Sequence, residues 1–225
     1  MKIDLVYIYP MNALADWEGY ACRFIATYHA FFPGYSHNVV VVCNGGHVTN
    51  AEASLFSSMP NIMFFHHDNS GQDIGGFRAY ARKSSADYLM MLGACAHFRR
   101  PDWLNRLVGV ANKHGAGLYG TLVNNEVRPH IRTTGFFCPP ALINHYDHPT
   151  DTKAGQYAFE HGPDCLTNLS LSLNLPTMLV TWDGERSPKD WHNAPNSFRS
   201  GDQSNCLTFD KHTDIYEHSQ HENKT

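Results

Sequence analysis

The sequence of 225 residues lacks any apolar run long enough to form a transmembrane helix, which needs about 18 or more such residues. Nor do the first ten residues form a signal peptide, because Asp4 interrupts their short apolar run and no small-residue cleavage site follows. Together these absences predict a cytoplasmic protein without a membrane span.

An excess of positive charge is also missing. The chain has 17 Lys and Arg against 21 Asp and Glu, a formal net charge of −4, so a broad nucleic-acid-binding surface is not expected. A local basic cluster could still hold one small anion: Arg78, Arg82, Lys83, Arg99 and Arg100.

None of the six cysteines lies in a Cys-x-x-Cys pair, and several lie within apolar runs. This pattern predicts buried, reduced thiols in a reducing compartment. The fifteen histidines include four candidates for a metal site, but no pair has a standard ligand spacing on a helix: His66, His67, His97 and His192. We therefore expect no metal site.

What the chain does contain is enough apolar material for a sizeable core, 42% of its residues. Continuous apolar strands alternate with helices in the first half, which predicts an α/β fold whose mostly parallel central sheet has helices on both faces. The predicted strands are 3–9, 37–43, 61–67, 88–92, 117–123, 132–137 and 178–182, and the predicted helices are 16–32, 50–58, 74–84, 102–114 and 164–173.

The second half is less regular. Residues 144–156 are predicted as a polar loop, and 183–205 as an ordered lid because so long a polar segment is usually functional or disordered and tryptophans accompany it. We predict a single domain over residues 1–216 and a polar C-terminal tail over 217–225.

Ligands of such sheets bind outside the carboxyl ends of the strands, where this chain places several polar side chains. The segment 68–76 follows the third strand; its glycines allow a ligand close to the backbone, and the next helix offers free N–H groups to an anion. The residues predicted to bind the nucleotide are Tyr9, Asn44, Asp68, Asn69, Gly71, Asp73 and His97.

The order of these elements resembles the GT-A glycosyltransferases of polysaccharide synthesis, over roughly residues 3–210. The resemblance rests on an Asn-x-Gly-x-x-x-Gly segment from Asn69, the strand 88–92 and the Pro-x-Trp-Leu sequence of 101–104. It implies a nucleotide-sugar donor and a glycan or other hydroxyl acceptor. In that family the strand runs into an Asp-x-Asp motif that holds a divalent metal. Here Gly93, Ala94 and Cys95 follow the strand, so metal-independent transfer is expected.

The same resemblance points to catalytic groups in the second half. Glu160, expected just before a helix, is the predicted general base, or else it caps that helix. His161 would share or orient this role. Arg132, with His130, would neutralise a leaving diphosphate, or else make a structural ion pair. Thr133 and Thr134 would line the sugar site.

Further substrate contacts are predicted in the acid- and tryptophan-bearing loops, because an aromatic face packs well on a pyranose ring. These residues are Trp182, Asp183, Trp191 and Asp202, with hydrophobic anchoring of the loop as the alternative for the aromatic ones. Two functions stay open. The retained glycine-rich loop, Arg132 and Glu160 favour a glycosyltransferase. The missing acidic pair favours a non-catalytic relative that binds a nucleotide or glycan.

Overall fold

The computed structural model describes residues 1–11, 15–125, 127–198 and 201–218. Eight strands form one sheet in the order β10-β9-β5-β8-β4-β1-β2-β3, and β6 pairs with β7 alone. The strands are β1 (Ile3–Tyr9), β2 (Asn38–Asn44), β3 (Ile62–His67), β4 (Tyr88–Leu92), β5 (Leu118–Gly120), β6 (Val123–Asn124), β7 (His130–Ile131), β8 (Gly135–Cys138), β9 (Thr177–Thr181) and β10 (Gly184–Arg186).

The strand pairing confirms the predicted fold class. β1, β2, β3 and β4 run parallel to one another, and β5 runs parallel to β9. β8 runs antiparallel between β4 and β5, and β10 runs antiparallel at the edge. The helices are α1 (Trp17–Ala30), α2 (Asn50–Leu55), α3 (Gln72–Ala81), α4 (Trp103–His114), α5 (Pro140–His145), α6 (Lys153–His161), α7 (Leu166–Ser172), α8 (Lys211–His218) and the 3-10 helix η1 (Pro188–Asn193).

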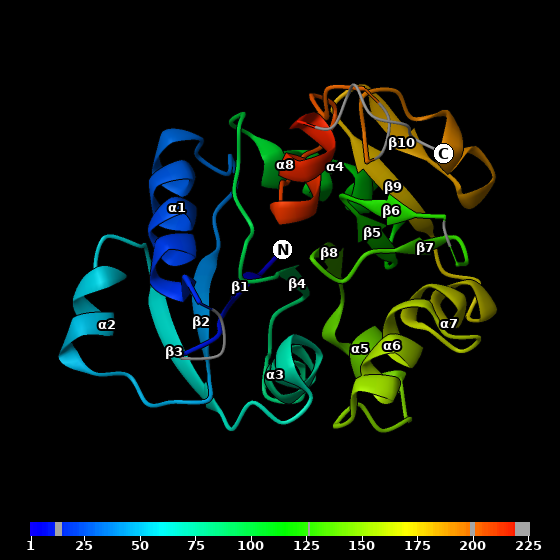
Figure 1. Ribbon diagram of the computed structural model, residues 1–225. Helices are drawn as coiled ribbons and strands as arrows, with labels where there is room; N and C mark the ends of the chain where they lie inside the picture. The colour runs from blue at the N-terminus through cyan, green and yellow to red at the C-terminus, as the bar shows by residue number, and fades with distance from the viewer. Residues whose placement is uncertain (12–14, 126, 199–200, 219–225) are drawn as a thin grey trace.

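The alternation of side chains along β1 divides the core into two layers. Leu5 and Tyr7 face the layer that α1 and α4 cover, where Tyr7 stacks on Phe24 with ring centroids 4.0 Å apart. Val6 and Ile8 face the opposite layer, beneath α3, α5, α6 and α7. Figure 1 shows these four helices together in the lower part of the view. Among the residues described, no helix is long and apolar enough to cross a membrane.

The predicted loop at 144–156 is wrong over its last residues, because α6 begins at Lys153. The side chain of Thr152 caps that helix by accepting a hydrogen bond from the Gly155 N–H at 3.1 Å. Only Gln156 and Phe159 of α6 are buried, so the segment shows too little apolar periodicity to indicate a helix.

Two other boundaries differ from expectation. The predicted lid is ordered where it is described, but it packs at the β9–β10 edge of the sheet. Trp191 is buried there, and its indole N–H donates to the Arg186 carbonyl at 3.0 Å. The predicted tail begins inside α8, where Glu217 pairs with Arg99 at 2.7 Å. The remaining tail, 219–225, and residues 199–200 of the predicted lid lie outside the described residues.

Candidate functional site

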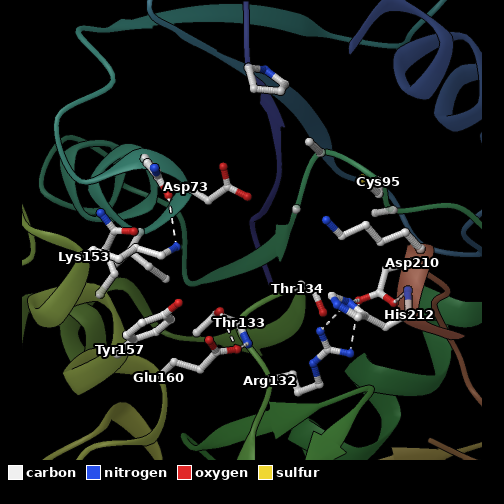
Figure 2. A pocket seen from close by; sticks show the side chains of 18 of the residues that line it. Asp73, Cys95, Arg132, Thr133, Thr134, Lys153, Tyr157, Glu160, Asp210 and His212 are labelled. Atoms are coloured by element: carbon white, nitrogen blue, oxygen red, sulfur yellow. Dashed lines mark hydrogen bonds and ion pairs between the residues drawn. The ribbon is translucent and has the colours of Figure 1, made fainter. Parts of the chain in front are cut away.

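A cavity of about 340 Å³ lies at the carboxyl ends of β1 and β4. Figure 2 shows side chains from distant parts of the chain around it, with Asp73 and Lys153 facing Arg132 and Asp210. The lining comes from the ends of β1 and β4, the first turn of α3, the segment before β8, α6 and the start of α8: Pro10, Asn69, Gln72, Asp73, Ile74, Gly93, Ala94, Cys95, Ala96, Arg132, Thr133, Thr134, Lys153, Gln156, Tyr157, Glu160, Asp210, Lys211 and His212.

The turn before α3 brings Asn69 and Asp73 to this cavity. Gly71 adopts a φ of 72°, and a Cβ there would lie 2.5 Å from the Thr150 carbonyl oxygen, so no larger residue fits without movement. The buried side chain of Asn44 holds the turn, because its Nδ2 donates to the Gln72 carbonyl at 3.0 Å. Gly71 and Asn44 therefore shape this part of the site, although neither lines the cavity.

The turn after β4 offers no hard ligand for a divalent metal. Gly93, Ala94 and Cys95 have no side-chain oxygen, and burial raises the pKa of the Cys95 thiol to about 11, so the thiol is neutral. Asp73 approaches this turn, with Oδ2 3.7 Å from the position of a Cβ on Gly93. No group of three His, Cys, Asp or Glu side chains suited to a metal occurs among the described residues. The residues present therefore do not fit the metal that the fold family implies.

Glu160 lies on the cavity wall, at a different place in the fold than predicted. It belongs to the last turn of α6, whereas the next helix, α7, starts at Leu166 after the N-cap residue Cys165. A carboxylate at the carboxyl end of a helix gains nothing from the helix dipole, which makes the capping alternative wrong. The Thr133 hydroxyl donates to Glu160 Oε1 at 3.1 Å and fixes the carboxylate beside the cavity.

Arg132 makes the ion pair that the sequence left as an alternative. Its Nη1 lies 3.4 Å from Asp210 Oδ2, and its Nη2 lies 3.0 Å from His212 Nδ1. Arg132 and Asp210 are 7% and 2% exposed. Burial alone would raise the pKa of Asp210, but the hydrogen bond from His212 and the charge of Arg132 hold that pKa well below its usual range.

The same wall carries buried polar atoms that make no well-formed hydrogen bond. Among the described residues these include Arg132 Nη1, Thr134 Oγ1 and Asp210 Oδ2. Arg132 Nη1 and Asp210 Oδ2 face each other in the ion pair at 3.4 Å, and Thr134 contributes to the lowered pKa of Asp210. Because buried polar atoms are nearly always hydrogen-bonded in folded proteins, the three side chains leave hydrogen-bonding capacity on this wall of the cavity.

Asp73 lines the cavity, and the pKa of its carboxyl group lies above the usual value. Burial raises its pKa to about 6, although the charges of Lys153 and Lys211 oppose the shift. An Asp with a raised pKa stabilises the folded state at acid pH, and this contribution is lost as the pH rises through 6.

We therefore expect Asp73→Asn to raise the melting temperature at pH 7.5 and to change it little at pH 4. The full shift would correspond to about 3 kcal/mol, and solvent in the cavity reduces that figure. Thermal denaturation at the two pH values checks this. Asp68→Asn is the matched control, because the Asp68 side chain is exposed and the pKa of Asp68 is lowered by bonds from Ser70, so it should not gain stability at pH 7.5. A lower melting temperature for Asp73→Asn than for the parent at pH 7.5 would contradict the assignment.

Several residues predicted for nucleotide binding or catalysis lie away from the cavity. Tyr9 is buried between Trp17 and Phe56, and His97 is buried beside Arg23 and Asp214. Asp68 points to solvent. His161 stacks on Tyr157 behind the wall, and His130 lies against His161; neither lines the cavity.

The residues predicted in the loops for substrate contact also lie elsewhere. Trp182 packs under the Arg100 guanidinium, 4.3 Å from the ring centroid, and Asp183 holds Arg186 through two hydrogen bonds. Trp191 is buried, and Asp202 accepts from the Ser204 N–H in an exposed turn. For the tryptophans the structure favours loop anchoring over stacking on a sugar.

Other cavity residues had no signal that singled them out in the sequence. Lys153, Gln156 and Tyr157 fall in or just after the segment taken as a loop. Residues 210–212 come from the far end of the chain. Their one local feature in the sequence is an Asp at position 210, a residue type that favours the N-cap of a helix. The Asp210 side chain accepts from the N–H groups of His212 and Thr213 at 2.8 and 3.0 Å.

The fold is similar to that of solved GT-A-type glycosyltransferases. Neither protein-family models nor curated protein sequences match the chain. Solved structures do. TarS from S. aureus, residues 1–349, superposes with a TM-score of 0.54 at 12% identity, covering 76% of this chain and 56% of that structure. TarS in complex with UDP-GlcNAc gives a TM-score of 0.52 at 13% identity, over 69% of this chain and 51% of that one.

A mannosyltransferase shares the fold as well. The mannosyltransferase PcManGT from Pyrobaculum calidifontis, in complex with GDP-Man and Mn²⁺, gives a TM-score of 0.52 at 13% identity, covering 68% of this chain and 49% of that structure. The chain therefore spans about half the length of the structures it matches. At such low identity the likeness establishes the fold alone.

Proposed function

We propose that the chain is a metal-independent glycosyltransferase, which moves a sugar from a nucleotide-sugar donor to a hydroxyl acceptor such as a glycan. The observation that carries this proposal is the cavity at the carboxyl edge of the sheet, whose lining brings the carboxylate of Glu160 together with the Arg132–Asp210 ion pair and Thr134. The buried polar atoms of these last three residues lack well-formed hydrogen bonds, which suits a cavity that takes a polar ligand.

The donor would lie with its nucleotide toward Asn69 and Asp73, at the first turn of α3, and its sugar toward Thr133 and Thr134. Two facts support this orientation. The site lies at the carboxyl edge of the sheet, where ligands of such sheets bind, and proteins of this fold are seen with UDP-GlcNAc and GDP-Man. Cell-surface polysaccharide synthesis is the process to which such a reaction would contribute.

In the proposed reaction Glu160 accepts the proton of the acceptor hydroxyl. The hydroxyl oxygen then forms the new bond to the anomeric carbon as the bond to the diphosphate breaks, and the diphosphate leaves with the bonding electrons. Thr133 orients Glu160 through the hydrogen bond at 3.1 Å. Arg132 would face the departing oxygens with Nη1, which makes no hydrogen bond and lies 3.4 Å from the Asp210 carboxylate that balances its charge.

The alternative is a non-catalytic relative that binds a nucleotide or glycan in the same cavity. The absence of acidic side chains at Gly93, Ala94 and Cys95 favours it, because those positions hold the metal in catalytic relatives. Binding and turnover distinguish the two functions.

A thermal-shift screen with UDP, GDP, UDP-GlcNAc and GDP-Man tests the proposal. We expect at least one ligand at 1 mM to raise the melting temperature by several degrees, and the increase should be the same in EDTA as in Mn²⁺. Incubation of the bound donor with candidate glycans should then release free nucleoside diphosphate. Binding without any release would support the non-catalytic relative, and no shift with any of the four ligands would count against both.

A further inference from the structure

The cavity that contains the turn after β4 is also lined by Lys211, a cation without a hydrogen-bond or ion-pair partner among the described residues. We propose that Lys211, the first residue of α8, binds the diphosphate of the donor in place of a divalent ion. This inference rests on the proposed function and adds to it the group that compensates the leaving charge.

Long-range pairing fixes Lys211 beside the turn after β4. His97 and Phe209 exchange two backbone hydrogen bonds, at 2.9 and 3.0 Å, so the chain that leads into α8 is in register with the end of that turn. The side chain of Asp210 then caps α8. The position of residue 211 against the cavity is therefore set by backbone pairing.

Ion pairs also hold α8 in place. Asp214 contacts Arg23 at 2.6 Å and Arg99 at 3.0 Å, and Glu217 contacts Arg99 at 2.7 Å. His97 lies 3.3 Å from Asp214. These ion pairs keep the first turn of α8 in place. When Lys211 binds an anion, only its own side chain therefore has to become ordered.

The charge of Lys211 acts on both sides of the gap where a metal would lie. It opposes the rise in pKa that burial causes at Asp73, on α3, and at Cys95, in the turn after β4. Lys211 also lines the cavity together with these two residues and Gly93. The lysine therefore shares the cavity with the turn that, in the family the sequence resembles, carries the oxygen ligands of a metal.

The Lys211 ammonium is not paired with a neighbouring side chain, unlike the cations of Arg132 and Lys153. Arg132 is paired with Asp210 and His212, and the Lys153 ammonium donates to Gln72 Oε1 at 3.4 Å. Lys211 makes no hydrogen bond or ion pair with any residue that the structure describes, and its side chain is exposed. A lysine binds phosphate as a compact point charge with three donors, which suits diphosphate oxygens that shift during departure.

The test is Lys211→Met, with Lys189→Met as the control. Both lysines are exposed, and Lys189 lies on η1 outside the cavity. Affinity for UDP and GDP, the nucleotides of the matched structures, is measured by calorimetry in EDTA. We expect Lys211→Met to weaken binding of the preferred nucleotide about tenfold, Lys211→Arg to restore most of it, and Lys189→Met to change it less than twofold. The tenfold difference should shrink in 0.5 M NaCl, because salt screens an exposed charge.

The outcomes separate this inference from the proposed function. If the parent binds a nucleotide in EDTA and Lys211→Met binds it equally well, the role of Lys211 is wrong and the proposed function stands. If the parent binds only when Mn²⁺ is present, a metal supplies the charge: the role of Lys211 and the metal independence of the proposed function are then both wrong, and nucleotide binding alone stands. If the parent binds neither UDP nor GDP under any of these conditions, the nucleotide-binding function fails and this inference fails with it.

Discussion

Arg132→Met should lower the free energy of unfolding by about 3–5 kcal/mol, the usual cost of removing one partner of a buried ion pair. The substitution keeps an unbranched side chain but leaves the carboxylate of Asp210, 2% exposed, without its cation. Urea denaturation at pH 7.5 measures the loss. At pH 3 the difference should be smaller: a carboxylate whose folded pKa is lowered stabilises the fold above its unfolded pKa of about 3.9, and that contribution fades as the pH falls.

Two further variants make this result interpretable. Lys113→Met breaks the ion pair with Glu185, in which the lysine side chain is 65% exposed, and should cost no more than about 1 kcal/mol. Adding Asp210→Asn to Arg132→Met removes the uncompensated charge and retains an oxygen to cap α8, so it should recover part of the stability. A cost for Arg132→Met no larger than that for Lys113→Met would show that the pair is not the buried anchor that its geometry indicates.

The sheet could be predicted from the sequence because its central strands are buried on both faces. The interior of β2, residues 39–43, is an uninterrupted apolar run, and the first four strands alternate with helices along the chain. The prediction failed where burial is sparse. In α6 only Gln156 and Phe159 are buried, so local pattern could not distinguish a helix from a loop.

The candidate site was predictable to the extent that it depends on strand ends. Asn69, Asp73, Arg132, Thr133, Thr134 and Glu160 were all expected near the ligand, and all line the cavity. The rule for strand ends gives the edge of the sheet but not the direction of each side chain. Tyr9 and His97 therefore satisfied the rule, although their side chains are buried in the core.

The residues of α8 could not be predicted in this role, because their place depends on a pairing between distant segments. Lys211 is brought to the turn after β4 by the two hydrogen bonds between His97 and Phe209, 112 residues apart in numbering (209 − 97). No local pattern records such a pairing. The same contact explains why His97, predicted to bind nucleotide, instead holds the segment that carries the free cation.

The largest functional effect is expected for Glu160→Gln, which retains the shape of the side chain and an oxygen that can accept from Thr133 but removes its basicity. A general base contributes about 10²–10⁴-fold, so the rate of glycosyl transfer should fall by that factor, equivalent to roughly 3–5 kcal/mol in the barrier. Donor affinity, measured by calorimetry in EDTA, should stay within about twofold, because the nucleotide is expected at Asn69 and Asp73, on the other side of the cavity.

Glu18→Gln is the control, an equal change of charge at an exposed position in the first turn of α1. It should leave both rate and affinity unchanged. Thr133→Val separates orientation from basicity: it removes the hydroxyl that donates to Glu160 Oε1 and should reduce the rate by a smaller factor, since the carboxylate keeps its charge but loses that donor. If Glu160→Gln transfers the sugar as fast as the parent does, the base is another group. Asp73 is then the next candidate, because it also lines the cavity and its pKa of about 6 lies near the pH at which a base must exchange its proton.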